Sequence, residues 1–530
     1  MIWIEEDVIM AISKELKEEL IVDYPTFIEN TKKFYNKEIS VQDYKGLSGP
    51  FGSYAEKGAN TGMSRWRFPG GVLDQDKIRF VAETIRRYDL KVPHFTTGQC
   101  IQFHNLDGDT IIKLFEECHR HGIYNRGAGG DHPRNTAASP LLGLYKDEIW
   151  DFSPYVKALS EYVLTFIKDI KFPRKFKTAF SNGQENSAHV TFKDFGVLAH
   201  PEDKTFSIYV AGGLGPNPKM GVLVGNHIQP EELLYYVKTL ALIFSEHGNY
   251  KNRSKARVRY LQDILGGPEA LQNTFKTYLA KVKETEKLTI NPSEFIYSIN
   301  KHGQVDPSLQ NSRVGEQKQE GLYYVNWHPY GGNPSQKQLL QVLEYVGGLD
   351  DEVQIRLSSD ESMYIVNLTA DEARQVLAIT ENGGTNDFYN SVSCIGATIC
   401  QVGLQDSSGL LIKIFDAVRK ATNVNSDLLP KFHISGCPSS CGTHQIGTIG
   451  FHGAMKVVNG VPTPAFRVFR GGNENLEHEH FAEQIGTIVS SDIPSFFVEL
   501  GQILTKANLT FDAWIQIHDA DFDELVSKYE

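Results

Sequence analysis

The stretch that decides the fold is Trp66-Arg-Phe-Pro-Gly-Gly71, which recurs as Trp327-His-Pro-Tyr-Gly-Gly332 at an offset of 261 residues. The same offset relates two sets of apolar residues, each with the i, i+3, i+4, i+7 spacing of one buried helical face. These sets are Ile78, Val81, Ala82 and Ile85, and then Leu339, Val342, Leu343 and Val346. A period this long excludes a solenoid, so the sequence predicts a duplicated α+β unit.

Each copy is expected to fold as a helix followed by a strand. Asp74 and Ser335 stand where the two helices would begin, and both residue types are typical N-caps. Residues 100–104 and 363–367 then have the composition of strands. Duplication predicts a pseudo-twofold arrangement with a cofactor between the copies, where ligand clefts often lie.

Four of the six cysteines form two tight pairs, Cys394-x5-Cys400 and Cys437-x3-Cys441. Four thiolates from two short loops are what a 4Fe–4S cube requires. Zinc is the first alternative, but a five-residue gap fits a zinc knuckle poorly. Four buried apolar cysteines are the second alternative, and the flanking Gly and Pro residues disfavour it. The spacing therefore favours an iron–sulfur cluster.

Bulk composition describes a globular chain of two or three domains, with 530 residues, 41% hydrophobic and 22% charged. A net charge of −12 argues against nucleic acid as a general partner. No apolar run has the length of a membrane span, and residues 1–7 lack the features of a secretory signal. With few cysteines and a cluster that needs reduced thiolates, we expect a cytoplasmic protein.

Several motifs together resemble the siroheme-dependent sulfite and nitrite reductases. The second cysteine pair lies in Gly436-Cys-Pro-Ser-Ser-Cys-Gly442. Upstream motifs follow in the family's order: Arg65-x-Arg67-Phe-Pro-Gly-Gly71, Gly130-Asp-His-Pro-Arg-Asn135 and Pro173-Arg-Lys-Phe-Lys-Thr178. The resemblance covers roughly residues 45–475. It implies two cofactors, a 4Fe–4S cluster and siroheme, with Cys441 bridging one cluster iron to the siroheme iron.

The resemblance also implies the architecture: an α+β fold with internally duplicated, ferredoxin-like half-domains and two larger α/β siroheme-binding domains around a pseudo-twofold axis. The expected segments are a helical arm (1–44), a first half-domain (45–125), a first siroheme- and substrate-binding domain (126–290), a connector (291–322), a second half-domain (323–375) and an iron–sulfur and siroheme-binding domain (376–530).

Four cations match the family's anion-binding positions: Arg65, Arg134, Lys175 and Lys177. Lys175 and Lys177 alternate within a short β-like run, which places both on one face. Taken singly, these residues would be interpreted as surface residues. Further siroheme contacts are implied at Gln99, Gln102, His104, Asn135, Arg174, Gly212 and Gly213. His104 fits equally well as a histidine with its partners inside a strand.

Two departures from the family's pattern concern the siroheme carboxylates. His94 and Gly98 stand where two arginines are expected. The lost anchors are either supplied from elsewhere, or the pocket takes a less anionic, amidated siroheme. Ser439 replaces a common asparagine without changing the cysteine spacing.

The resemblance implies a six-electron reduction of sulfite to sulfide, with nitrite to ammonia as the alternative. Lys177 favours sulfite, because nitrite reductases often carry asparagine there. A hypothesis from another class is a non-catalytic iron–sulfur electron-transfer protein. No flavin or nicotinamide motif is present, so an external one-electron donor such as ferredoxin is expected. The basic run Lys251–Arg259 is one candidate for its docking patch, and a solvated helix face is the other interpretation.

Overall fold

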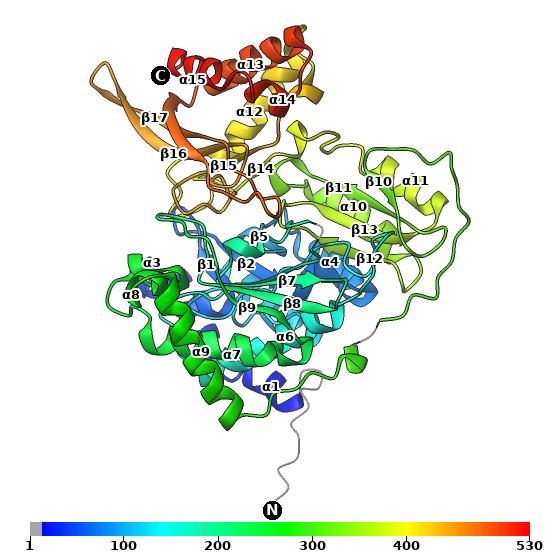
Figure 1. Ribbon diagram of the computed structural model, residues 1–530, viewed down its shortest axis with the longest axis vertical. Coiled ribbons are helices and arrows are strands. Elements are labelled where there is room, and N and C mark those ends of the chain that lie inside the picture. The colour runs from blue at the N-terminus through cyan, green and yellow to red at the C-terminus, as the bar shows by residue number, and fades with distance from the viewer. Residues whose placement is uncertain (1–12, 184, 296) are drawn as a thin grey trace, which may run out of the picture.

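A computed structural model describes residues 13–183, 185–295 and 297–530 (Figure 1). The described chain forms four sheets, two for each copy of the repeat. The smaller sheet of the first copy has the order β1-β2-β5-β4 and is antiparallel throughout. Its strands are β1 (Ser53–Ala55), β2 (Gly62–Arg67), β5 (Cys100–Leu106) and β4 (Val92–Phe95). The prediction of an internally duplicated α+β fold is confirmed.

The smaller sheet of the second copy has the order β10-β11-β13-β12-β3. Four of its strands are β10 (Val314–Glu316), β11 (Tyr323–Trp327), β13 (Met363–Leu368) and β12 (Gln354–Leu357). The fifth, β3 (Val72–Leu73), comes from the first copy and pairs with β12. The two copies therefore share a sheet, which the repeat alone did not reveal.

The helices α4 (Gln75–Tyr88) and α10 (Gln336–Gly347) pack against each other between the copies. All eight apolar residues of the two predicted faces are buried. Asp74 accepts a hydrogen bond from the Lys77 N–H, and Ser335 forms a capping box with Gln338. The predicted helices, N-caps and following strands are thus confirmed.

Two larger sheets follow the same plan in each copy. The first has the order β6-β7-β8-β9, and β6 pairs with β7 in parallel. The second has the order β14-β15-β16-β17-β18, with β14, β15 and β16 parallel. Their bounds are β6 (Thr178–Ser181), β7 (Phe195–His200), β8 (Thr205–Val210), β9 (Val222–Ile228), β14 (Val392–Ser393), β15 (Phe432–Ser435), β16 (Ile449–Val458), β17 (Val461–Arg470) and β18 (Glu483–Val489).

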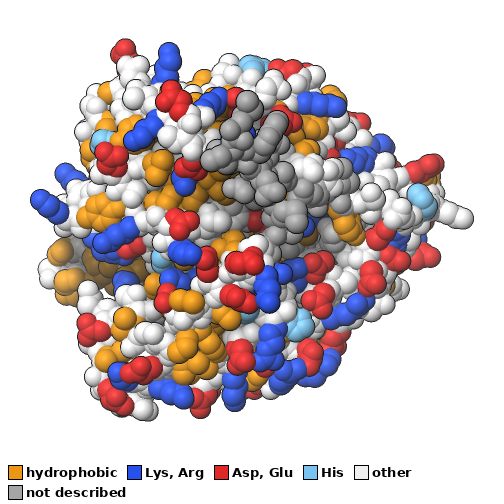
Figure 2. Space-filling model, turned by 90° about the horizontal axis from the view of Figure 1, so that it is seen from below, with side chains coloured by type: hydrophobic (Ala, Val, Ile, Leu, Met, Phe, Trp, Pro, Cys, Tyr) orange, Lys and Arg blue, Asp and Glu red, His pale blue; other side chains and the backbone are white. Residues whose placement is uncertain are grey.

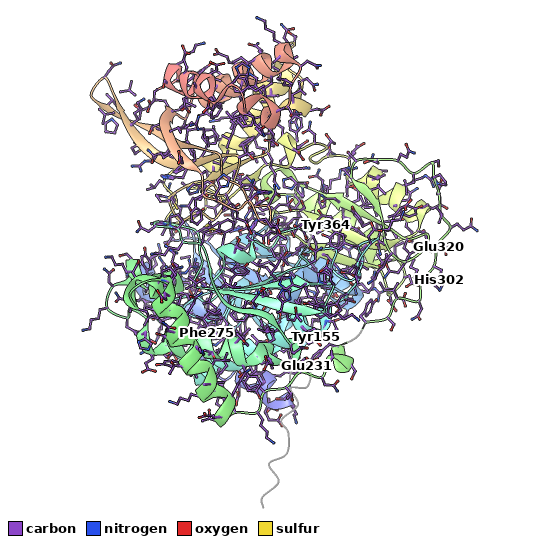
Figure 3. All side chains as sticks on the ribbon, viewed as in Figure 1. Tyr155, Glu231, Phe275, His302, Glu320 and Tyr364 are labelled. Atoms are coloured by element: carbon purple, nitrogen blue, oxygen red, sulfur yellow. The ribbon has the colours of Figure 1, made fainter. Side chains whose placement is uncertain are left out.

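Helices cover these larger sheets and close two separate cores. In the first copy they are α6 (Ser153–Asp169), α7 (Leu233–His247) and α9 (Pro268–Thr285), and in the second α12 (Ser407–Lys420), α13 (Ile493–Ala507) and α15 (Asp519–Lys528). Figure 3 shows Tyr155, Glu231 and Phe275 in the lower, first-copy part of the molecule and Tyr364 in the second copy. Tyr155 Oη donates to Glu231 Oε1 at 3.3 Å and so joins α6 to the start of α7.

The N-terminal region contains α1 (Lys14–Glu19), α2 (Tyr24–Tyr35) and α3 (Val41–Ser48). Phe27 and Phe34 of α2 are buried, as an amphipathic arm requires. Residues 1–12 of the expected arm lie outside the described residues. The segment expected as a connector, 291–322, contains β10, which pairs with β11 as an edge strand of the second sheet.

Surface character varies little over the face shown in Figure 2, where acidic and basic side chains are interspersed. This face therefore presents no continuous field of one sign. Among the described helices, none is both long enough and apolar enough to cross a membrane.

Candidate active site

Both cysteine pairs lie at one edge of the second larger sheet. β14 and β15 are parallel neighbours, so the chain leaves both strands at the same edge. Cys394 directly follows β14, and Cys437 follows β15 by two residues. The loops bond to each other, because Gly436 N–H donates to Cys394 Sγ at 3.1 Å and Leu404 N–H donates to Gly436 O at 2.9 Å. Sheet register thus brings the two pairs together.

The four cysteines form no disulfide with one another. Burial raises the pKa of Cys394 to about 12 and also raises the pKa of Cys400, and the neighbouring Cys441 acts in the same direction on both. In the described chain no three His, Cys, Asp or Glu side chains converge on a single ion position. Four thiols on two loops that bond to each other suit a cube, in which each thiolate binds a different iron.

A strained turn presents Cys441. Ser440 and Thr443 on either side have left-handed backbones, with φ of 55° and 53°. Gly442 allows a close approach, since an added Cβ would lie 2.1 Å from Ile434 O. Cys441 itself is exposed, and its carbonyl accepts from Thr97 Oγ1 at 3.0 Å. Thr97 lies between β4 and β5, so the first copy contacts the cysteine turn directly.

Arg65 and Arg134 are held by backbone carbonyls rather than by carboxylates. Arg65, on β2, donates from Nη1 to Ala128 O at 2.9 Å. Gln102 lies opposite it on β5, and with the Gln102 amide turned so that its oxygen faces Arg65, that oxygen accepts from Arg65 Nη2 and Nε at 2.5 and 2.8 Å. Arg134 donates to Gly130 O at 2.6 Å, and burial lowers the pKa of Arg134 to about 10. Both guanidinium groups are therefore fixed while their charge stays uncompensated.

Lys175 and Lys177 flank Phe176 in the extended run that enters β6. Phe176 is fully buried and forms a parallel bridge with Pro133. Because side chains alternate along an extended run, both lysines point away from that core. Burial lowers the pKa of both lysines, and the positive charge of Arg257 lowers them further. The lysines are thus more acidic ammonium groups than usual.

The lysine run and the cysteine turn lie within electrostatic reach of each other. The Cys441 thiol acts to raise the pKa of Lys175 and of Lys177, opposing the effect of burial. The Gly-rich loop after β8 adds a direct link, because Gly215 N–H donates to Gln445 Oε1 at 2.8 Å and Gln445 Nε2 donates to Gly215 O at 3.0 Å. One site therefore combines first-copy cations with second-copy cysteines.

Positive charge exceeds negative charge in this site. In the part of the chain that the structure describes, Arg65, Arg134, Lys175 and Lys177 form no ion pair with a carboxylate. Lys193 is a further unpaired cation there, and burial, with Lys177 acting in the same direction, lowers its pKa to about 7. Buried charges are normally paired. The surplus indicates that the site holds an anion.

Sequence reasoning missed Arg257, Asp194 and Lys193. Arg257 belongs to the basic run Lys251–Arg259, which was a candidate docking patch or solvated helix face. The structure excludes Arg257 and Arg259 from such a patch or face, because Arg257 binds the fully buried Asp194 at 3.1 Å and Arg259 is 3% exposed. The earlier part of the run, residues 251–255, is exposed. The sequence does contain a pattern that indicates Arg257, because Arg257 and Arg259 flank a fully buried Val258, as the two lysines flank Phe176.

Two family profiles match this chain. The profile "Nitrite/Sulfite reductase ferredoxin-like half domain" matches residues 54–121, and "Nitrite and sulphite reductase 4Fe-4S domain" matches residues 129–283. The chain belongs to the nitrite and sulfite reductase family. The expected resemblance is thus confirmed, and so are the ferredoxin-like half-domain and the enzymatic class.

Relatives of this reductase include enzymes for both substrates. The assimilatory ferredoxin-dependent nitrite reductase of Haloferax mediterranei is 24% identical over 87% of this chain and 82% of its own length. The ferredoxin–nitrite reductase of Synechococcus elongatus is 24% identical over 83% and 85%. The ferredoxin sulfite reductase of Mycobacterium tuberculosis is 24% identical over 82% and 79%. The structure of the Mycobacterium tuberculosis NirA protein matches with a TM-score of 0.79 at 22% identity, covering 97% and 98% of the two chains, which confirms the fold.

Reductases of this family carry a 4Fe–4S cluster and siroheme. The residues of this chain fit both groups. The cysteine loops suit a cluster, and the unpaired cations suit the carboxylates of siroheme and an oxyanion. Gly212 packs tightly on the protein itself, because a Cβ there would lie 2.8 Å from the backbone oxygens of Lys193 and Thr191.

Gln99 and Asn135 of this reductase are bound mainly to the protein itself. Gln99 is fully buried, with φ of 54°, and its amide donates to Ala138 O and Leu357 O, both at 2.7 Å. Asn135 Nδ2 donates to Phe68 O at 2.8 Å, while its Oδ1 is buried with no partner among the described residues. Gln99 therefore supports the fold, and Asn135 has one amide oxygen left for a ligand.

The other expected siroheme contacts differ in whether they are already bound to another group of the protein. His104 bonds Glu56 at 2.7 Å inside the first sheet, which matches the simpler interpretation of a partnered strand histidine. Arg174 lies 3.5 Å from Asp131. Gly213 lies against the Arg257 guanidinium. The structure thus brings Gly213 to the cation site, whereas His104 is already paired.

His94 does not replace the arginine expected at its position. It is buried, bonds Asn333 Oδ1 at 2.9 Å, and burial lowers the pKa of His94 to about 3. The imidazole is therefore neutral near pH 7 and adds no positive charge. Gly98 has no side chain, so any replacement cations must come from elsewhere in this reductase.

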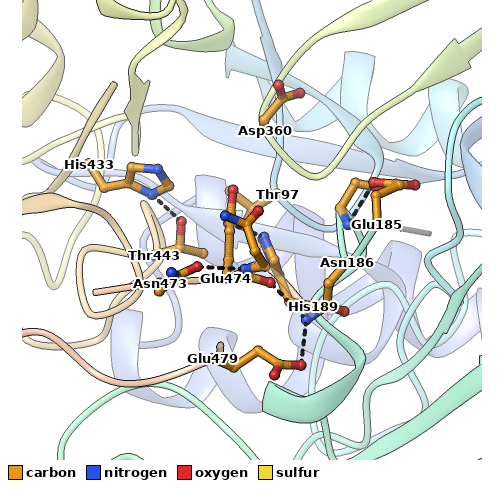
Figure 4. A network of polar contacts seen from close by, with 12 residues as sticks. Thr97, Glu185, Asn186, His189, Asp360, His433, Thr443, Asn473, Glu474 and Glu479 are labelled. Atoms are coloured by element: carbon orange, nitrogen blue, oxygen red, sulfur yellow. Dashed lines mark hydrogen bonds and ion pairs between the residues drawn. The ribbon is translucent and has the colours of Figure 1, made fainter. Parts of the chain in front are cut away.

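A second polar network, drawn in Figure 4, joins the copies. His189 Nε2 bonds Glu474 Oε2 at 2.6 Å across 285 residues of sequence. Burial would raise the pKa of Glu474, but the charge and hydrogen bond of His189, with Lys431 and His433, lower it to about 2. This carboxylate is therefore ionised in the folded reductase and holds the copies together.

Proposed function

We propose that this chain reduces sulfite to sulfide in a six-electron reaction, with nitrite to ammonia as the second candidate. The observation that carries the anion-reducing function is the set of partly buried cations without carboxylate partners beside Cys441 in the described chain. Sulfite is the larger and more highly charged anion near neutral pH, so it gains more from the adjacent Lys175 and Lys177. Nitrite remains the second candidate because the relatives include nitrite reductases at the same identity.

Cys394, Cys400, Cys437 and Cys441 are proposed as the ligands of the cluster. The exposed position of Cys441 suits the additional role of bridging to the siroheme iron. When bound, these two groups would supply the electrons and an iron to which the anion is attached. The protein contributes the two bonded loops and the left-handed turn that place the thiols.

Arg65, Arg134, Lys175 and Lys177 are proposed to hold the anion and to donate protons to its oxygens. Reduction of sulfite with six electrons and eight protons yields hydrogen sulfide and three waters, so each departing oxygen needs protons nearby. Lys175 and Lys177 suit this role because burial lowers the pKa of both, which makes each ammonium a better acid. The two arginines stay charged and keep the anion in place.

An external one-electron carrier of the ferredoxin type is the proposed donor. The relatives named above are ferredoxin-dependent enzymes. The proposed docking surface no longer includes Arg257 and Arg259, which face inward. Lys251 and Arg253, at the start of the same run, remain exposed. A weak patch of this size would act by local attraction, since the net charge of −12 disfavours an acidic partner overall.

Steady-state reduction with a chemical one-electron donor tests the substrate. The protein loaded with both cofactors would be assayed for kcat/KM with sulfite and with nitrite, and we expect the larger value for sulfite. A larger value for nitrite would replace sulfite by the second candidate. A visible spectrum of the same sample separates the classes, since a cluster without siroheme would favour the electron-transfer hypothesis.

A further inference from the structure

A buried ion pair between Arg257 and Asp194 lies beside the lysine run. Asp194 is fully buried, and its two oxygens accept from Arg257 Nη2 at 3.1 and 3.3 Å. Asp194 Oδ2 also accepts from the backbone N–H of Lys177 at 2.9 Å. One carboxylate therefore fixes the guanidinium relative to the run that carries the lysines.

Arg257 also borders the glycine loop that follows β8. A Cβ added to Gly213 would lie 3.6 Å from Arg257 Nη2, which is ordinary contact. After burial, the charge of Arg257 is the largest influence that lowers the pKa of Lys175 and Lys177. The guanidinium thus lies close to both the loop and the lysines, inside the cation site.

One donor of Arg257 is unused. The side chain is 13% exposed, and its Nε is buried without an acceptor among the described residues. A buried N–H of a charged group that lacks an acceptor is costly and rare in folded proteins. A ligand oxygen at this position would remove that cost.

Because His94 and Gly98 stand where two arginines are expected, the site needs another cationic donor. His94 is neutral and bonded to Asn333, so it supplies no cation to the site. We propose that Arg257, oriented by Asp194, is a fifth anion-binding cation of the site and donates its Nε–H to an anionic oxygen. That oxygen belongs either to the substrate oxyanion or to a siroheme carboxylate. The inference rests on the proposed function and names a residue that the sequence motifs did not include.

The test compares R257Q with R257K, and uses K255Q as the matched control. K255Q removes one positive charge from the same basic run at an exposed position. Each purified holoenzyme is measured for siroheme and iron content, for thermal unfolding, and for sulfite and nitrite affinity through the visible spectrum. These readouts do not depend on turnover.

Two results support the proposal and identify the oxygen. If Arg257 binds the substrate, R257Q keeps its siroheme and loses about tenfold or more in anion affinity, as expected for one charge-assisted hydrogen bond. If Arg257 binds a siroheme carboxylate, R257Q loses siroheme while its iron content persists. K255Q should match the wild type in all readouts. R257Q with unchanged siroheme content and unchanged affinities for both anions would overturn the proposal.

If R257Q does not fold, R257K tests the proposed role of Arg257 instead. Lysine keeps the charge but lacks the Nε–H, so the same loss of affinity or of siroheme is expected to a smaller extent, and wild-type values would overturn the proposal. A wild-type protein that binds no siroheme and reduces neither anion would refute the proposed function instead, which keeps the two failures distinct.

The positioning role of Asp194 has its own test in a double-mutant cycle. D194N alone should weaken the readout that R257Q weakens, and D194N should add little further loss in the R257Q background. Full additivity would show that Asp194 does not act through Arg257. A purely structural role would lower thermal stability without this non-additive loss of binding.

Discussion

In the first copy the turn Gly70–Gly71 leads into α4, and in the second the turn Gly331–Gly332 leads into α10. All four glycines have positive φ, between 57° and 75°. A Cβ on Gly71 would lie 2.4 Å from Leu357 O in the second copy, and one on Gly332 would lie 2.6 Å from Phe95 O in the first. Each turn therefore packs on the backbone of the opposite copy, so one contact is made twice.

A second pair of equivalent positions shares a backbone conformation but carries different side chains. Gln99 and Glu361 both have left-handed backbones, with φ of 54° and 70°. The Gln99 amide oxygen accepts from Ala138 N–H at 2.9 Å, and the Glu361 carboxyl accepts from Ser393 N–H at 3.0 Å. Burial raises the pKa of Glu361 well above its usual value. A carboxyl group whose protonated form is favoured by burial thus takes the place of an amide at the equivalent position.

The copies differ in how their basic strand ends are neutralised. Lys431, before β15, lies 3.4 Å from Asp360, whereas Lys175 and Lys177, before β6, have no carboxylate partner among the described residues. The paired cysteines stand only in the second copy. We propose that the shared frame sets the geometry of the site and that uncompensated charge determines which copy receives the anion. The following predictions test that division, beginning with the largest effect.

Cys441→Ser should have the largest effect, because both copies contribute residues to the site around this thiolate. Serine cannot replace a thiolate that serves the cluster and siroheme together, so we expect loss of siroheme, a depleted cluster and no detectable reduction of either anion. The measurement is iron and siroheme content of the purified variant, because lost activity alone also follows from misfolding. Native cofactor content with full activity would rule out the bridging role.

Arg134→Ala and Lys175→Ala should lower kcat/KM by about 10- to 100-fold, since each removes a charge-assisted hydrogen bond of roughly 1.5–3 kcal/mol to a buried anion. Lys431→Gln is the matched change in the second copy and should leave anion affinity unchanged. Iron content serves as the control for an intact cluster. Equal losses from Lys175→Ala and Lys431→Gln would remove the distinction between the copies.

Glu474→Gln should weaken the contact between the copies in a pH-dependent way. The folded pKa of Glu474 is lowered from 4.5 to about 2, so its ionised form stabilises the fold fully above pH 4.5. That contribution is lost as the pH falls toward 2. Thermal unfolding of the wild type should therefore become more acid-sensitive than that of the variant. Parallel melting curves for the two proteins between pH 2 and 5 would contradict this.

The sequence predicted those parts of the fold that depend on residues close together in the chain. The helical faces, the caps at Asp74 and Ser335, and the cysteine loops all follow from spacing that is visible in the sequence. Arg257 and Asp194 were missed because they are 63 residues apart and meet only through tertiary packing. The crossing of β3 into the other copy's sheet has the same cause.

Function was predicted by motif co-occurrence, and its finer points depend on single side chains. The family and both cofactors are confirmed, whereas the boundaries of the six expected segments and the roles of the individual site residues stay predictions. Two cations on either side of an apolar residue are a sequence pattern that indicates an extended run with its middle residue in the core. The pattern Lys175-Phe-Lys177 was interpreted as one face of a strand, but Arg257-Val-Arg259 was interpreted as surface, although the apolar residue between the cations is buried in both.

Lys177→Asn should shift the preference of the site from sulfite toward nitrite, the smallest of these effects. Removing one cation from the unpaired set costs the more highly charged sulfite more than monoanionic nitrite, which can still accept hydrogen bonds from the introduced amide and from Lys175. The backbone N–H of residue 177 keeps its bond to Asp194, so the run should stay in place. The measurement is the ratio of kcat/KM for the two anions in wild type and variant. An unmoved ratio at unchanged siroheme content would show that selectivity is set by the rest of the cation set rather than by this position.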